Sequence, residues 1–265
     1  MTTSAPRLPP GAPEPENEVR LSFVEHLREL RKRLVHAIYG ILAGMALVGW
    51  FVPSIVDGLM APVRAALPEG DRTLWTRTAV EPWFVYLKVA IYGGLFLAAP
   101  WVLWQLWQFV APGLYKRERR LVLPFLFFGT LLFYAGAAFC YFIVLPPAFP
   151  ALLSIIEGTA IKPLWTLSEQ LSLVLAMLLG FGVVFEVPVI IGFLSMIGLV
   201  SWRFLAKYRR HAIIANVALA AIITPTGDPV NLALMAVPLI LFYEIGIVLA
   251  RILGKKPAPA GKGAT

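Results

Sequence analysis

Two stretches of the chain, residues 34–56 and 121–145, carry no charged side chain and are each long enough to cross a lipid bilayer. A transmembrane helix needs about 20 mostly apolar residues, because the hydrocarbon core is about 30 Å thick. The composition agrees: 59% of the residues are hydrophobic and only 14% are charged, whereas about a quarter are charged in soluble domains. We therefore predict an all-α integral membrane protein.

Four more apolar stretches bring the predicted number of transmembrane helices to six. They run over residues 82–110, 170–199, 211–223 and 230–250. The stretch 121–145 is expected to end at Pro146 and Pro147. The fifth and sixth spans are predicted to be short, and the fifth, with about 13 residues, reaches only about 20 Å as a helix. Either basic residues before it extend toward the headgroups from within a longer helix, or the bilayer thins locally. The sequence allows both.

An amphipathic helix is predicted before the first span, over residues 22–34. Phe23, Leu27 and Leu30 recur there at helical spacing, and charged side chains fill most of the positions between them. Glu29 could form an ion pair with Arg33, four residues later on the same helix. Such a helix typically lies in the membrane interface. Residues 1–20 are rich in proline and acidic side chains, and we predict that they form a disordered tail.

The lysines and arginines lie mostly on one side of the predicted spans. Five of the 23 fall on the side of the first, third and fifth connecting segments, and the others lie in the N-terminal region, residues 116–120, residues 202–210 and the C-terminal tail. Cytoplasmic segments carry this excess, so both termini are predicted to be cytoplasmic. The chain then has a six-span domain, residues 21–253, and a cytoplasmic tail, residues 254–265. Despite the net charge of +8, the basic groups form no groove-sized patch, which argues against nucleic acid.

The sequence contains no arrangement of residues that would support catalysis. Its three histidines do not form the H-E-x-x-H pattern of a metalloprotease, and no G-x-S-x-G motif offers a serine nucleophile. The single cysteine, Cys140, excludes a disulfide framework and a thiol metal site. We predict a protein that is not an enzyme and binds no cofactor or metal.

One carboxylate, Glu186, lies inside the apolar run GFGVVFEVPVIIG, residues 180–192. Glu169 and Arg203 are each about 25 Å away along a helix, which places Glu186 near the bilayer midplane. A carboxylate there must face protein or water, and is by default a candidate functional residue. The alternative is a protonated acid that only bonds a neighbouring helix. Pro188, two residues later, is expected to kink the span.

Six motifs occur in order along the chain: HLRELRKRL (26–34), EPWFVYLK (81–88), APGLYKRERR (111–120), FGVVFEVP (181–188), TPTGDP (224–229) and YEIG (243–246). With them, residues 20–252 resemble TatC, the multi-spanning subunit of the twin-arginine (Sec-independent) protein translocase of the cell membrane. The resemblance implies a receptor that binds twin-arginine signal peptides at the cytoplasmic face. With single-span TatA- and TatB-type partners in an oligomeric complex, it would move folded proteins across the membrane using the proton-motive force.

The resemblance also implies roles for particular residues. The signal-binding carboxylates of the family fall on Glu29 and Glu118, and a carboxylate matches the planar fork of an arginine. The acid that meets partner helices inside the membrane falls on Glu186. The supporting motif residues are Leu27, Arg31, Arg33, Pro82, Pro112, Arg119, Pro188 and Asp228.

Two features of the motifs complicate this assignment. The basic residues beside the two glutamates, among them Arg31, Arg33 and Arg119, would repel an incoming arginine, so the carboxylates must be presented on a selective face. The turn TPTGDP is also one residue longer than the TPPD of many family members. The polar role of the Gln that often follows TPPD is therefore unassigned.

Two other functions remain open at this point. A proton-coupled secondary transporter would use Glu186 as its relay, and such proteins often contain inverted repeats. The two halves of the chain show no convincing repeat. A purely structural membrane scaffold would explain the spans but not an acid at the midplane.

Overall fold

The computed structural model describes residues 23–67, 73–110, 122–154, 164–223 and 229–254. The helices are α1 (Phe23–Gly49), α2 (Val52–Leu59), α3 (Ala61–Ala66), α4 (Glu81–Leu97), α5 (Ala99–Val110), α7 (Val122–Phe139), the π-helical turn η2 (Cys140–Val144), α8 (Leu145–Ser154), α9 (Leu167–Phe185), α10 (Val187–Met196), α11 (Trp202–Lys207), α12 (Arg209–Ile223) and α13 (Pro229–Leu253). Within these ranges the only pairing of extended backbone is an isolated bridge between Trp75 and Thr166. The all-α prediction is confirmed.

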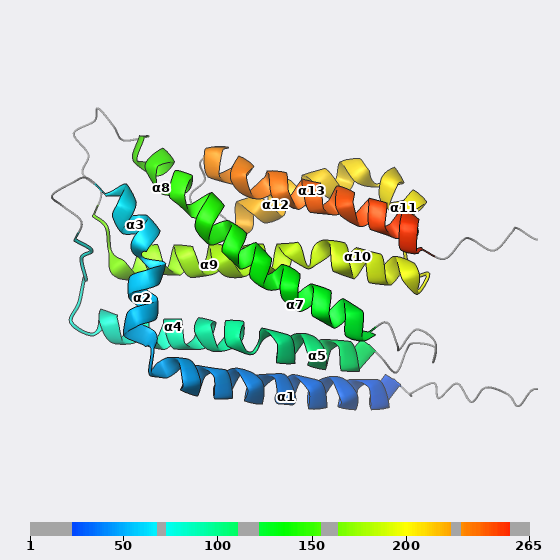
Figure 1. Ribbon diagram of the computed structural model, residues 1–265, viewed down its shortest axis with the longest axis horizontal. Helices are drawn as coiled ribbons and strands as arrows, with labels where there is room; N and C mark the ends of the chain where they lie inside the picture. The colour runs from blue at the N-terminus through cyan, green and yellow to red at the C-terminus, as the bar shows by residue number, and fades with distance from the viewer. Residues whose placement is uncertain (1–22, 68–72, 111–121, 155–163, 224–228, 255–265) are drawn as a thin grey trace, which may run out of the picture.

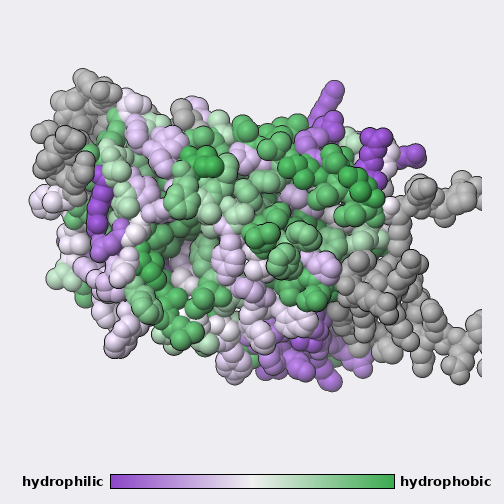
Figure 2. All heavy atoms as spheres, in the orientation of Figure 1, coloured by the Kyte–Doolittle hydropathy of each residue, from purple (hydrophilic) through white to green (hydrophobic). Residues whose placement is uncertain are grey.

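The long helices run along the longest axis of the molecule, and α7 crosses them at an angle (Figure 1). The first turn of α1 and the last turn of α13 lie at the same end. On the face shown in Figure 2, the most hydrophilic residues gather toward the two ends, and apolar residues cover much of the surface between them. This distribution suits a protein whose middle lies in hydrocarbon.

Four described helices are long and apolar enough to cross a membrane by themselves: Val24–Gly49, Val122–Ser154, Leu167–Met196 and Leu232–Leu253. The pair α4 and α5 makes a fifth if it is one span, bent by 56°. The predicted fifth span corresponds to α12, which has 15 residues and therefore reaches about 22 Å. Six spans thus remain a prediction.

The amphipathic segment at the start of α1 is helical, as predicted, but it is not a separate element. It continues without a break into the first span, so the prediction of a helix lying apart in the interface is wrong. Alternating apolar and charged positions define the faces of a helix, not the direction of its axis. The span ends at Gly49 and not at Val56, because Pro53 lies in the first turn of the new helix α2, where a proline is well tolerated.

The bend between α4 and α5 has a local cause in Pro100, near the start of α5. Proline has no backbone N–H, so the carbonyl one turn earlier, that of Phe96, loses its usual helical donor. The hydroxyl of Tyr134 on α7 donates to this carbonyl over 2.8 Å. Helix α7 therefore supplies a donor to the carbonyl that the bend leaves without one. Inside a bilayer this is important, because no water is available to replace the donor.

The third span was predicted to end at Pro146 and Pro147, and this prediction is wrong. The helix continues to Ser154 through the π-helical turn η2, which lies just before the two prolines. In η2 the N–H of Leu145 bonds the carbonyl of Cys140, five residues earlier. The prolines then occupy the first turn of α8, where a missing N–H costs little.

Of the helices that correspond to the last two predicted spans, α12 is short, as predicted, and α13 is not. Helix α13 has 25 residues, so the prediction that the sixth span is short is wrong. The basic segment before α12 is divided between two helices, with Lys207 in α11 and Arg209 in α12. Arg209 forms an ion pair of 2.8 Å with Glu244 of α13, so its charge is held at the end of the bundle.

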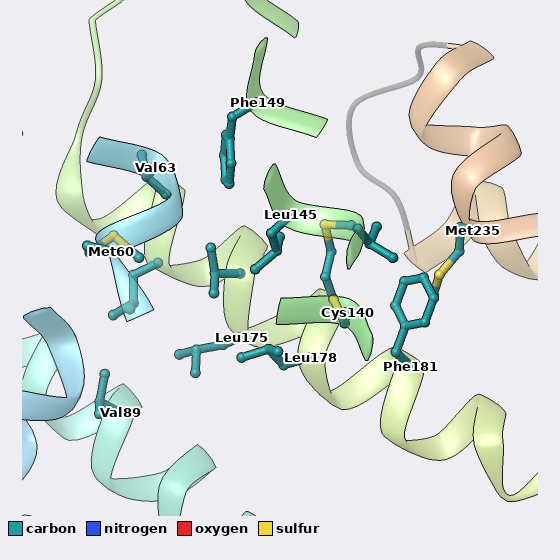
Figure 3. Packing of buried hydrophobic residues seen from close by; sticks show 14 of the residues in the cluster. Met60, Val63, Val89, Cys140, Leu145, Phe149, Leu175, Leu178, Phe181 and Met235 are labelled. Carbon is teal, nitrogen blue, oxygen red and sulfur yellow. The ribbon is translucent and has the colours of Figure 1, made fainter. Parts of the chain in front are cut away.

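Close helix crossings hold the bundle together. A side chain added at Gly44 of α1 would meet the Gly94 backbone of α4 at 2.6 Å, and one at Gly182 of α9 would meet Phe133 of α7 at 2.8 Å. Small residues that let helices approach are typical of membrane proteins. Behind these crossings lies one large apolar cluster, in which Leu175 and Phe181 pack with residues of α2, α4, η2 and α13 (Figure 3).

Candidate functional site

Glu29 lies in the second turn of α1, near the end of the molecule where this helix begins. Its Oε1 accepts a hydrogen bond of 2.6 Å from Nε of Arg33, one turn later. The two side chains are 24% and 25% exposed. Nη1 of Arg33 donates to Oε1 of Gln105 on α5 over 3.3 Å, and Gln105 is 3% exposed. The carboxylate therefore belongs to a chain of contacts that joins α1 to α5.

Three further contacts fix α1 against α5. The ring of His26 stacks on Phe109 with 4.4 Å between centroids. Trp101 donates its indole N–H to the carbonyl of His36 over 2.9 Å. Trp101 also lies against Gly40, where an added side chain would approach it to 2.2 Å. The helix that carries Glu29 is therefore held against α5 both before this residue, at His26, and after it, at His36 and Gly40.

Glu186 lies between α9 and α10, where the regular helix is interrupted, and Pro188 occupies the first turn of α10. The regular helix is therefore interrupted just before Pro188, and the predicted kink of the span stays a prediction. Glu186 is 7% exposed and faces α7 at Gly129, where an added side chain would meet Oε2 at 2.9 Å. Among the described residues, Oε1 has no hydrogen-bond partner.

The buried Oε1 of Glu186 can accept a hydrogen bond that no described residue donates. A buried polar atom without a partner costs about 1–3 kcal/mol relative to a bonded one, and more if it is charged. Because Glu186 is buried, its carboxylate faces protein, as expected. The alternative, a hydrogen bond to a neighbouring helix, is not seen for Oε1 in the described part of the chain. The atom is an acceptor that a donor from another molecule would satisfy.

At the opposite end, Pro82 lies in the first turn of α4, beside Glu81. Glu81 accepts hydrogen bonds from the backbone N–H groups of Arg77 and of Ser168, the latter at 3.2 Å. The side chain of Arg77 forms an ion pair with Glu169. These contacts tie the start of α4 to the start of α9 through Glu81 and Arg77.

The model of one protein family, Sec-independent protein translocase protein (TatC), matches residues 25–238. The chain belongs to the TatC family. A TatC of Koribacter versatilis is 41% identical over 238 residues, which are 89% of this chain and 87% of that protein. The TatC of Escherichia coli K12 is 38% identical, over 86% of this chain and 88% of its own length.

Solved structures agree with the sequence relatives. A crystal structure of the twin-arginine translocase receptor TatC matches this fold with a TM-score of 0.74 and 36% identity, over 86% of this chain and 99% of the other. A second, in the detergent DDM, gives a TM-score of 0.75 and 35% identity, over 88% and 100%. The chain is therefore a multi-pass protein of the cell membrane and a component of a protein translocase, not an enzyme.

Several of the predicted TatC site residues cannot be placed. Glu118, Pro112, Arg119 and Asp228 lie outside the described residues. Of the others, Leu27 is 47% exposed and Arg31 is exposed, so neither contributes to the core. Among the described site residues the structure brings together Glu29 and Arg33, and this ion pair between residues four apart was predicted.

The sequence also gave no warning of three partner residues. Gln105 accepts a hydrogen bond from Arg33, the partner of Glu29, and Gly129 lies next to Glu186, but each comes from another helix. The third is Ser172 of α9, whose hydroxyl accepts a hydrogen bond of 2.7 Å from Nζ of Lys88, the one charged residue inside the predicted second span. An apolar helix that contains one isolated polar residue was the only available signal, and it does not identify the partner.

Metal or catalytic chemistry finds no support in the described part of the chain. It contains no group of three His, Cys, Asp or Glu residues that would hold a metal ion. An apolar cavity of about 340 Å³ lies between α2, α4, α7 and α9. Its lining includes Leu59, Val89 and Leu178 and no charged residue, so it offers no group for acid–base or nucleophilic chemistry.

Proposed function

We propose that this TatC protein is the receptor subunit of its translocase and binds twin-arginine signal peptides at the cytoplasmic face through Glu29 and Glu118. In this proposal the chain crosses the membrane six times with both termini in the cytoplasm, as the excess of basic residues on that side predicts. The translocase moves folded proteins across the membrane, driven by the proton-motive force.

The placement of Glu29 is the observation that carries this proposal. Its carboxylate is partly exposed, at the end of the molecule where α1 begins. Carboxylates bind guanidinium groups through two parallel hydrogen bonds, which an ammonium group cannot form. A partly buried carboxylate on a rigid helix is suited to selecting arginine over lysine, because little side-chain entropy is lost on binding.

We further propose that Glu186 meets a polar group of a single-span TatA- or TatB-type helix. Its unpartnered Oε1 supports this role, since a donor from another helix would remove the cost of leaving the atom unsatisfied. A buried polar contact between membrane helices contributes about 0.5–2 kcal/mol. That is enough to fix the register and the choice of partner, while apolar packing supplies the rest.

Site-specific photo-crosslinking of a twin-arginine precursor to the membrane-embedded protein tests the receptor role. Glu29→Ala and Glu118→Ala should each lower signal-peptide crosslinking about tenfold or more, because a charge-assisted hydrogen bond contributes about 1.5–3 kcal/mol. Glu25→Ala is the matched control, since it removes the same charge one turn earlier on α1. Unchanged crosslinking in both test variants would exclude this site.

A further inference from the structure

The guanidinium of Arg33 already occupies the carboxylate that is proposed to receive a signal arginine. Nε of Arg33 lies 2.6 Å from Oε1 of Glu29. The other side of the same guanidinium donates to Gln105 over 3.3 Å. Three quarters of each charged side chain is buried, so this pair is better shielded from solvent than an ordinary surface ion pair. A chemical equivalent of the ligand therefore fills the site before the ligand arrives.

We propose that Arg33 is a resident competitor for Glu29, which an incoming arginine must displace, and that it sets the affinity threshold for signal peptides. The inference rests on the proposed role of Glu29. In this inference Arg33 does more than repel other cations by its charge. Its hydrogen bond to Oε1 of Glu29 makes that oxygen unavailable to any other donor.

The geometry explains why this competition is effective. Arg33 is attached to the same helix one turn from Glu29, so it is always present at high effective concentration. Two-point recognition of an arginine needs both carboxylate oxygens, and one is engaged. When Arg33 leaves, the buried amide oxygen of Gln105 also loses its donor, which adds to what the ligand must offset.

The consequence is a filter against weak ligands. Any single cation that approaches Glu29 gains one ion pair and breaks another, so its net gain is small. A ligand succeeds when it brings further contacts of its own, as a peptide with consecutive arginines and an apolar segment does. Removing Arg33 should therefore strengthen the binding of all cationic ligands, and not change only the preference for arginine.

The test is a binding titration on the full chain in lipid nanodiscs. The probe is a fluorescent peptide with two consecutive arginines and an apolar segment, and fluorescence anisotropy gives its Kd. Arg33→Gln should lower Kd about two- to fivefold, the range for an i,i+4 pair that is partly shielded. Arg33→Lys keeps the positive charge but replaces the planar guanidinium by an ammonium group, which binds a carboxylate less well. It should therefore also lower Kd, by a smaller factor than Arg33→Gln.

Lys32→Gln separates competition from simple charge. Lys32 directly precedes Arg33 on α1 and is exposed. Its replacement therefore removes the same charge and leaves the Glu29–Arg33 contact in place. Arg33→Gln must tighten binding more than Lys32→Gln does. Equal effects would show that only repulsion is relieved, and weaker binding would show that Arg33 positions Glu29; either result overturns the inference.

Glu29→Gln in the same titration distinguishes the two proposals. If it leaves Kd unchanged, the proposed receptor site fails, and the inference fails with it. If Glu29→Gln raises Kd, and does so at least tenfold when Arg33→Gln has already removed the competitor, as a lost charge-assisted contact should, the receptor site stands. The Arg33 variants then decide the inference alone.

Discussion

The contact between Glu186 and Gly129 makes a sharp prediction about packing inside the membrane. A methyl group added by Gly129→Ala would lie 2.9 Å from Oε2, 3.3 Å from Oε1 and 3.5 Å from Cδ of Glu186. Ordinary contacts are about 3.5–4.0 Å, so the carboxylate or α7 must shift by several tenths of an ångström. Overpacking of this kind typically costs about 1–3 kcal/mol. We expect Gly129→Ala to lower the free energy of unfolding by that amount.

A double-mutant cycle identifies Glu186 as the cause. In a Glu186→Ala background the methyl group of Gly129→Ala has room, so most of its cost should disappear, leaving a coupling free energy of about 1 kcal/mol or more. The measurement is reversible unfolding in detergent micelles, followed by tryptophan fluorescence. Gly58→Ala is the control, because nothing lies within 4 Å of its added carbon and the change should stabilise α2 by up to about 1 kcal/mol.

Additive costs would refute this reasoning. If Gly129→Ala destabilises the protein equally with and without the carboxylate, within about 0.5 kcal/mol, then Gly129 is needed for the approach of the helices and not for the acid. The same variant bears on function. If the carboxylate must present an acceptor to a partner helix, Gly129→Ala should also reduce co-purification of the single-span partner.

Two other contacts inside the membrane can be tested in the same unfolding assay. Tyr134→Phe removes the donor to the Phe96 carbonyl at the α4–α5 bend and should cost about 1–3 kcal/mol; an unchanged free energy of unfolding would mean that the carbonyl finds another donor. Ser172→Ala removes the acceptor of the Lys88 ammonium group and should also cost about 1–3 kcal/mol. A cost well below 1 kcal/mol would indicate that Lys88 reaches water instead.

Helix content, family membership and the burial of Glu186 were predictable because each depends on a pattern within one segment. Apolar stretches of sufficient length require helices in a bilayer, since backbone groups must be satisfied internally. The distances from Glu186 to Glu169 and Arg203 along one helix place it deep in a span without any knowledge of neighbours. In the structure Glu186 lies between α9 and α10 and is 7% exposed; its depth in the membrane stays a prediction.

The errors arose where a local signal has two structural outcomes. Pro146 and Pro147 were taken as a helix end, but after a π-helical turn they fit the first turn of another helix. The charged and apolar faces of residues 23–34 were taken as an interfacial helix, but the same faces continue into α1. In each case the deciding factor is the conformation of the adjoining residues, which single-residue preferences do not specify.

The partners that site residues find on other helices could not be predicted, because they depend on which helices cross. Arg33 is four residues from Glu29, yet the geometry that engages it also involves Gln105 of α5. A sequence shows that an arginine and a glutamate are one turn apart, a spacing at which pairs form readily. It does not show that a buried amide on another helix holds the arginine in place, and that is what turns a common pair into part of a site.

The environment of Glu186 also separates the two functions that the sequence left open for it. A proton relay needs a continuous path of donors and acceptors through the protein. Within the described residues, Oε1 has no hydrogen-bond partner, and Oε2 faces the bare backbone of Gly129. No side chain of the described part therefore continues a path from Oε1. An acceptor that is buried, unpartnered and placed where two helix segments meet is better suited to a donor that arrives on another helix.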